Sequence, residues 1–123
     1  MTKREELNLM NSFRFRLVYW LMDEYMMTRK EAFAKAGLTT EILKALGEGI
    51  VEFSFKKDDG SVRKARGTLC KGISEVFDDY EYKTDRQEET DIKDMFTYFD
   101  LDWQAFRTFK ASRVIDIITI KTK

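Results

Sequence analysis

Apolar residues in the first 49 positions recur with the period of an α-helix. One row, at spacings of three and four, consists of Leu7, Met10, Phe13, Leu17 and Leu21. Further bulky apolar residues surround that row, at Phe15, Val18, Tyr19, Trp20 and Met22. A helix that is apolar on most sides has to be covered by the rest of the chain or by a second copy. These residues therefore either form a core between helices or support a homodimer through residues 7–27, with an interface at Phe13, Leu17, Trp20 and Leu21.

Two shorter helices are expected to follow. Thr28 and Glu31 form a capping box, so a second helix should begin there and run to about Ala36. Gly37 can end that helix in the left-handed conformation. A third short helix is expected over residues 41–46. We therefore predict a module of two or three helices over residues 1–48.

The hydrophobic period changes from 3.6 to 2 at Ile50, which indicates β-strands. The alternation runs to residue 56 and resumes over 62–69, on the far side of a turn. A two-residue turn would set apolar side chains against charged ones. A three-residue loop, with Gly60 in the left-handed conformation, sets Phe53 opposite Ala65 and keeps the apolar face intact. We predict this second arrangement.

The remainder contains an acidic insertion and three more strands. Residues 72–94 carry many carboxylates and few apolar anchors, so we expect a long loop with one helical turn at 74–77. Strand patterns return over 95–99, 106–110 and 115–121, and 111–114 should form a tight turn. The prediction is an α+β chain with helices over 1–48 and a five-stranded SH3- or Sm-like small β-barrel over 49–123. Closure of the barrel would remove free strand edges.

Several short motifs occur in the order typical of one family. They are Gly49–Phe55, Asp59-Gly60-Ser61, Arg63–Leu69, Tyr98-Phe99-Asp100 and Phe106–Lys110. Together they resemble the WYL-like Sm/SH3 small-barrel family of phages and mobile elements, over residues 49–121. Phe106 holds a place where that family usually has Trp. By analogy with larger WYL regulators, the resemblance implies a barrel that senses a ligand or a nucleic acid.

Charge is distributed unevenly along the chain. Lys plus Arg total 22 and Asp plus Glu total 22, yet the strands are basic and the insertion is strongly acidic. The basic strands suggest a surface that binds nucleic acid or a nucleotide, with aromatic rings stacking on bases. The residues of this predicted site are Lys64, Arg66, Tyr98, Phe106, Arg107, Lys110 and Arg113. The alternative is an ordinary solvated face.

The acidic insertion allows three interpretations. It is a solvated loop, a segment that folds over the basic face, or an imitation of nucleic-acid phosphates that binds a host protein. The third would make the protein an anti-defence inhibitor of the anti-CRISPR kind, encoded by a phage or mobile element. Its contact residues would be Asp78, Asp79, Glu88 and Glu89.

Composition argues against catalysis, cofactors and membranes. The chain has no His, and Cys70 is its one cysteine, so His-based triads, internal disulfides and Cys-rich zinc sites are excluded. The acidic pairs lack the spacing of a calcium loop, and we expect no metal site. The longest apolar run, 17–22, is far too short to cross a bilayer. We expect a non-enzymatic binding or regulatory protein without a cofactor, located in the cytoplasm.

Overall fold

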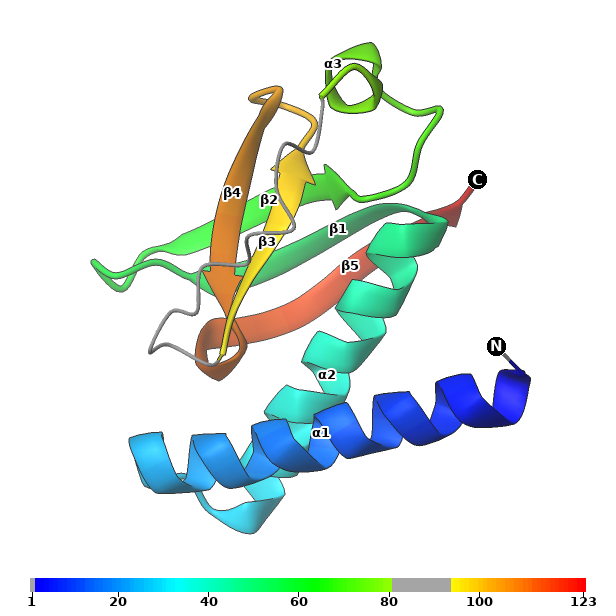
Figure 1. Cartoon of the computed structure of the whole chain (residues 1–123). Helices are drawn as coiled ribbons and strands as arrows, with labels where there is room; N and C mark the ends of the chain where they lie inside the picture. Colours follow the sequence, from blue (N-terminus) through cyan, green and yellow to red (C-terminus); the bar gives the residue numbers. More distant parts are fainter. Residues whose placement is uncertain (1, 81–93) are drawn as a thin grey trace.

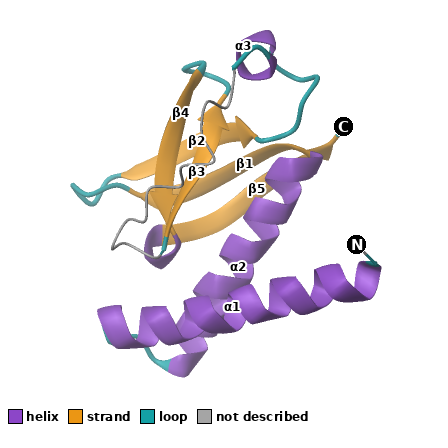
Figure 2. Ribbon diagram, viewed as in Figure 1, coloured by secondary structure: helices purple, strands orange, loops and turns teal. Residues whose placement is uncertain are grey.

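The computed structural model describes residues 2–80 and 94–123 (Figure 1). The elements are α1 (Lys3–Tyr25), α2 (Arg29–Glu48), β1 (Gly49–Lys56), β2 (Val62–Thr68), α3 (Glu75–Asp78), β3 (Met95–Asp100), β4 (Ala105–Lys110), the 3₁₀ turn η1 (Ala111–Arg113) and β5 (Val114–Thr122). The strands form one curled antiparallel sheet, α2 runs beside it, and α1 crosses α2 (Figure 2). The predicted α+β order of helices followed by a five-stranded SH3/Sm-like domain is confirmed.

The strand order in the sheet is β4-β3-β2-β1-β5. The β1–β2 register pairs Phe53 with Ala65, as the apolar pattern predicts. Gly60 has a φ of 85°, and its amide donates to the Lys57 carbonyl at 3.0 Å, which completes the predicted loop. The sequence predicts a barrel whose strands close on one another, and the structure differs from this at one junction. Among the described strands β4 and β5 do not pair, because η1 turns the chain sharply between them.

One helix, α2, replaces the second and third helices expected from the sequence. Thr28 caps it as predicted, with its hydroxyl accepting from the Glu31 amide at 3.2 Å. The helix continues through Gly37, which lacks the positive φ needed for a left-handed cap. Burial of Ala36 and Ile42 on one side of the helix explains this continuity, since packing on the sheet outweighs the low helix propensity of one glycine.

The core of the barrel includes one face of α2. Ile42 and Leu46, both fully buried, belong to the same cluster as Val51, Phe53 and Val114 of β1 and β5. The end of the helix is also tied to the strands, because the Leu69 amide donates to the Leu46 carbonyl at 2.8 Å. The predicted division into residues 1–48 and 49–123 stays a prediction, and the largest hydrophobic cluster crosses it.

The predicted dimer residues of α1 pack within the chain. Leu17 and Leu21 are buried in a cluster with Ala32 and Ala36 of α2, and Phe13 and Trp20 pack against that cluster. The ring of Phe13 also contacts that of Phe96 in β3, with centroids 5.7 Å apart. The placement differs from a free interface because the chain's own α2 and sheet bury Leu17 and Leu21 and partly cover Phe13 and Trp20. The homodimer itself stays a prediction.

A buried aspartate joins the end of α1 to the sheet. Asp94, wholly inaccessible, accepts hydrogen bonds from the Tyr25 hydroxyl at 3.1 Å and the Ser112 amide at 3.1 Å. This contact fixes the end of α1 beside η1.

The helical turn predicted at 74–77 is α3, one residue later in the chain. The Ser74 hydroxyl accepts from the Phe77 amide at 3.4 Å and caps the turn. Phe77 packs against Phe99 and Leu101, so α3 covers the end of the sheet away from α2. Most of the acidic insertion, including Glu88 and Glu89, lies outside the described residues.

Two glycine-to-alanine substitutions should shift stability in opposite directions. In Gly37→Ala the new methyl group meets no atom within 4 Å, so the unfolding free energy should rise by about 0.5–1 kcal/mol. Gly60→Ala forces alanine into the left-handed region and should cost about 1 kcal/mol. Urea unfolding of both variants measures this, and a loss of stability in Gly37→Ala would contradict the continuous helix.

Candidate functional site

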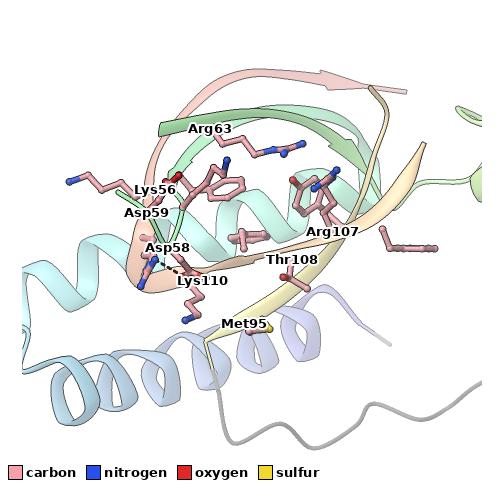
Figure 3. Close-up of a pocket in the computed structure, with 14 residues that line it drawn as sticks. Lys56, Asp58, Asp59, Arg63, Met95, Arg107, Thr108 and Lys110 are labelled. Atoms are coloured by element: carbon pink, nitrogen blue, oxygen red, sulfur yellow. Dashed lines mark hydrogen bonds and ion pairs between the residues drawn. The ribbon is translucent and has the colours of Figure 1, made fainter. Parts of the chain in front are cut away.

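A pocket of about 620 Å³ opens between the tip of the β1–β2 hairpin and the β3–β4 pair (Figure 3). Its basic lining residues are Lys56, Lys57, Arg63, Arg107, Lys110 and Arg113. Two carboxylates, those of Asp58 and Asp59, also line it. Basic side chains therefore outnumber acidic ones three to one around a single hollow.

Both acidic residues of the rim are already engaged within the chain. Asp58 pairs with Arg113, Oδ1 to Nη1, at 2.7 Å, which links the hairpin tip to η1. Asp59 accepts from the Ser61 hydroxyl at 2.6 Å and from its amide at 2.9 Å. The hydroxyl bond, followed by the amide bond, holds the pKa of Asp59 below its ordinary value. The lysines of the rim have no ion pair among the described residues, so the pocket keeps an excess of positive charge.

The pocket brings together five of the seven predicted binding residues. Those that line it are Tyr98, Phe106, Arg107, Lys110 and Arg113. Lys64 and Arg66 do not, because side chains alternate along β2 and these two point to the face opposite Ala65. Arg66 instead pairs with Asp102 at 3.3 Å on an exposed surface.

Arg63 is a basic residue that the alternation of β2 places on the pocket face. It shares the parity of buried Ala65, and this signal is present in the sequence. Its Nη2 pairs with Oδ2 of Asp100 at 2.7 Å. Asp100 is 1% exposed, and its other oxygen accepts from the amides of Asp102 and Trp103 at 2.9 and 3.0 Å. One carboxylate thus fixes both Arg63 and the β3–β4 turn.

Tyr98 lies in the floor of the pocket and cannot stack on a base as predicted. Its side chain is 0% exposed, and its ring packs edge-on against Phe53 with centroids 5.2 Å apart. Gly67 makes room for it, since a Cβ there would lie 2.6 Å from Tyr98 Cδ2. Burial raises the pKa of the Tyr98 hydroxyl to about 12; the Asp100 carboxylate adds to the rise, and Arg63 and Arg107 oppose it.

One exposed aromatic ring beside the pocket belongs to Trp103. Its side chain is 64% exposed, and the Arg107 guanidinium lies 4.9 Å above its ring in a cation–π contact. Phe106, predicted to stack on bases, is half-buried and packs edge-on against Phe99 at 5.2 Å and beside Phe77. Trp103 was not predicted as a site residue, because a tryptophan in a short turn has no periodic signal of exposure.

The acidic residues predicted to bind a host protein are only partly described. The Asp78 carboxylate accepts from the Gly72 amide at 3.0 Å through both oxygens, so it stabilises its own loop. Asp79 is exposed and follows α3 as its C-cap. The acidic interface therefore stays a prediction.

The raised pKa of Tyr98 predicts a loss of stability at alkaline pH. Below pH 10 the hydroxyl is protonated in both the folded and the unfolded chain. Between about pH 10 and 12 only the unfolded chain loses this proton, so the unfolding free energy should fall by about 2–3 kcal/mol. Urea unfolding of wild type and Tyr98→Phe at pH 9 and 12 isolates this contribution, because every other titratable group is common to the two proteins. Equal losses in the two proteins would contradict it.

No helix among residues 2–80 and 94–123 is long and apolar enough to span a membrane. No curated protein and no solved structure matched the chain.

A family model does match, over residues 39–115, and its description is WYL_2, Sm-like SH3 beta-barrel fold. The match begins within α2, earlier than the resemblance at 49–121 predicted, and ends in β5. The earlier start agrees with the packing of α2 in the core of the barrel. The chain belongs to the WYL_2 family of Sm-like SH3 beta-barrels.

Proposed function

We propose that this protein is a non-enzymatic, cytoplasmic module that binds single-stranded nucleic acid, or the nucleotide unit of one, through the basic pocket. The observation that carries the proposal is the gathering of six basic side chains around one hollow whose two carboxylates are already engaged. Phosphates supply the negative charge that such a surface attracts, and they dominate the affinity of nucleic-acid binding. The positive charge is local, since the net charge of the whole chain is zero.

The size of the pocket favours a single-stranded ligand. A volume of about 620 Å³ is within the range of small-molecule sites, so it accommodates one nucleotide unit. A base-paired duplex would lie across the opening, whereas a flexible strand can direct one unit inward. The remaining phosphates would then contact Lys56, Lys57 and Lys110 at the rim.

Trp103 supplies the aromatic contact in this proposal. One face of its ring carries the Arg107 guanidinium, and the side chain is largely exposed. Stacking of a base on an exposed aromatic ring is tolerant of sequence, because every base has a π-face. Arg107 lines the pocket, so a base on Trp103 would lie next to a phosphate held at the rim.

Binding of single-stranded oligonucleotides should depend on the lysines of the pocket and on salt. Replacing Lys110 by Ala should weaken binding and reduce the slope of log affinity against log salt by about 0.7, the value for one phosphate contact. Lys64→Ala is the matched control, because Lys64 lies on the opposite face of β2. Fluorescence anisotropy at two salt concentrations measures both variants. Absence of binding at low salt, or equal effects of the two variants, would contradict the proposal.

Loss of the Trp103 ring should weaken oligonucleotide binding selectively. Stacking contributes about 1–3 kcal/mol per base, so Trp103→Ala should lower affinity roughly 5- to 100-fold. Inorganic polyphosphate offers no base, and its binding should change little. Trp103→Phe, which keeps an aromatic face, is expected to restore part of the affinity. A parallel loss of polyphosphate binding would show instead that Trp103 only positions Arg107.

A further inference from the structure

Three buried hydrogen-bond donors in the floor and wall of the pocket have no acceptor. They are the Tyr98 hydroxyl, Nε of Arg63 and Nε of Arg107. Unsatisfied buried polar atoms are uncommon in native proteins, and each carries a desolvation cost. Three such donors among the residues that line one pocket indicate a site for an anion with several oxygens.

The strand register places the three side chains on one face. Tyr98 lies directly opposite Arg107 in the β3–β4 ladder, so their side chains point the same way. Asp100, two residues after Tyr98, shares that face and holds Arg63 by its ion pair. Figure 3 shows Arg63 and Arg107 directed into the pocket from β2 and β4. The charges of Arg63 and Arg107 both oppose the raised pKa of the Tyr98 hydroxyl, and Arg63 also acts on it as a hydrogen-bond donor.

The charges around Arg63, Tyr98 and Arg107 favour a doubly charged anion. Asp100 neutralises one of the two guanidinium groups, and Arg113, at the rim, is already paired with Asp58. Arg107 and the lysines of the rim remain for the ligand. The Tyr98 hydroxyl keeps its proton at neutral pH and is therefore a donor.

These three hydrogen-bond donors fit the end of a nucleic-acid strand better than its interior. A terminal phosphate monoester has three free oxygens and one bond to the rest of the ligand. An internal phosphodiester has two free oxygens and two bonds to the rest of the nucleic acid. The buried Tyr98 closes the floor of the pocket, so a nucleic-acid strand cannot pass through it. The Arg63 side chain is 19% exposed, so part of it is open to a phosphate that enters from the rim.

We propose that Arg63, Tyr98 and Arg107 form a subsite for a terminal phosphate, so that the protein holds the phosphorylated end of a nucleic-acid strand. This inference rests on the proposed binding of nucleic acid at the basic pocket.

The test compares three single-stranded oligonucleotides of one sequence with the full-length protein. One carries a 5′-phosphate, one a 3′-phosphate, and one hydroxyl groups at both ends. Wild type should bind one of the phosphorylated strands roughly tenfold more tightly than the hydroxyl strand, the effect of one or more charged hydrogen bonds. Tyr98→Phe should reduce that preference to within about twofold.

Thr108→Val is the matched control. It also removes a hydroxyl from the pocket lining. Thr108 is exposed and, because side chains alternate along β4, points to the face opposite that of Arg107. The preference for the phosphorylated strand should therefore persist in this variant. Tyr98→Phe removes an unsatisfied hydroxyl, so its melting temperature at pH 7 should equal or exceed that of wild type. If Tyr98→Phe does not fold, Arg63→Lys replaces it, since lysine keeps the charge and lacks Nε.

Each failure has a distinct meaning. Equal binding of all three strands by wild type would overturn the terminal-phosphate subsite and leave the proposed function standing. A preference that survives in both Tyr98→Phe and Arg63→Lys would also overturn it, because charge at the rim alone would then account for the preference. Absence of binding to every strand at low salt would overturn the proposed function itself.

Discussion

The buried carboxylate of Asp100 is the group on which both the turn of the sheet and the pocket depend. One oxygen accepts from two amides of the β3–β4 turn, and the other pairs with Arg63. A buried carboxylate is costly unless all of its bonds are made, so turn and arginine are stabilised together. The β3–β4 turn also places Trp103 beside Arg107. The aromatic and the basic parts of the pocket therefore have one common support.

Local patterns in the sequence predict most of the fold. Thr28 and Glu31 mark the start of α2, and the alternation around Phe53 and Ala65 selects the hairpin register. Gly37 predicts the end of a helix, but α2 continues through it, because burial of the helix face on the sheet outweighs this local stop signal. The covering of α1 by α2 and β3 is a tertiary contact that no local pattern contains.

The candidate site is harder to predict, for a geometric reason. Arg63 follows from parity along one strand, but the contributions of Lys56 and Lys57 depend on where the hairpin tip lies relative to β4. The sequence predicts that Tyr98 is an exposed stacking residue, whereas in the structure Gly67 leaves space for its ring to be buried. Trp103 stands in a turn whose shape is set by Asp100. Each of these depends on a contact between segments distant in sequence.

The pairing of β1 with β5 has a consequence for how the chain reaches this state. β1 pairs with both β2 and β5, and residues 57–113, nearly half of the chain, separate β1 from β5. The hairpin can form early, but the surface on which α2 rests is complete only when β5 docks. Closing such a long loop is slow compared with local pairing. The rate-limiting event in folding should therefore be the arrival of β5, and the pocket, which needs η1 beside the hairpin tip, would acquire its final shape only then.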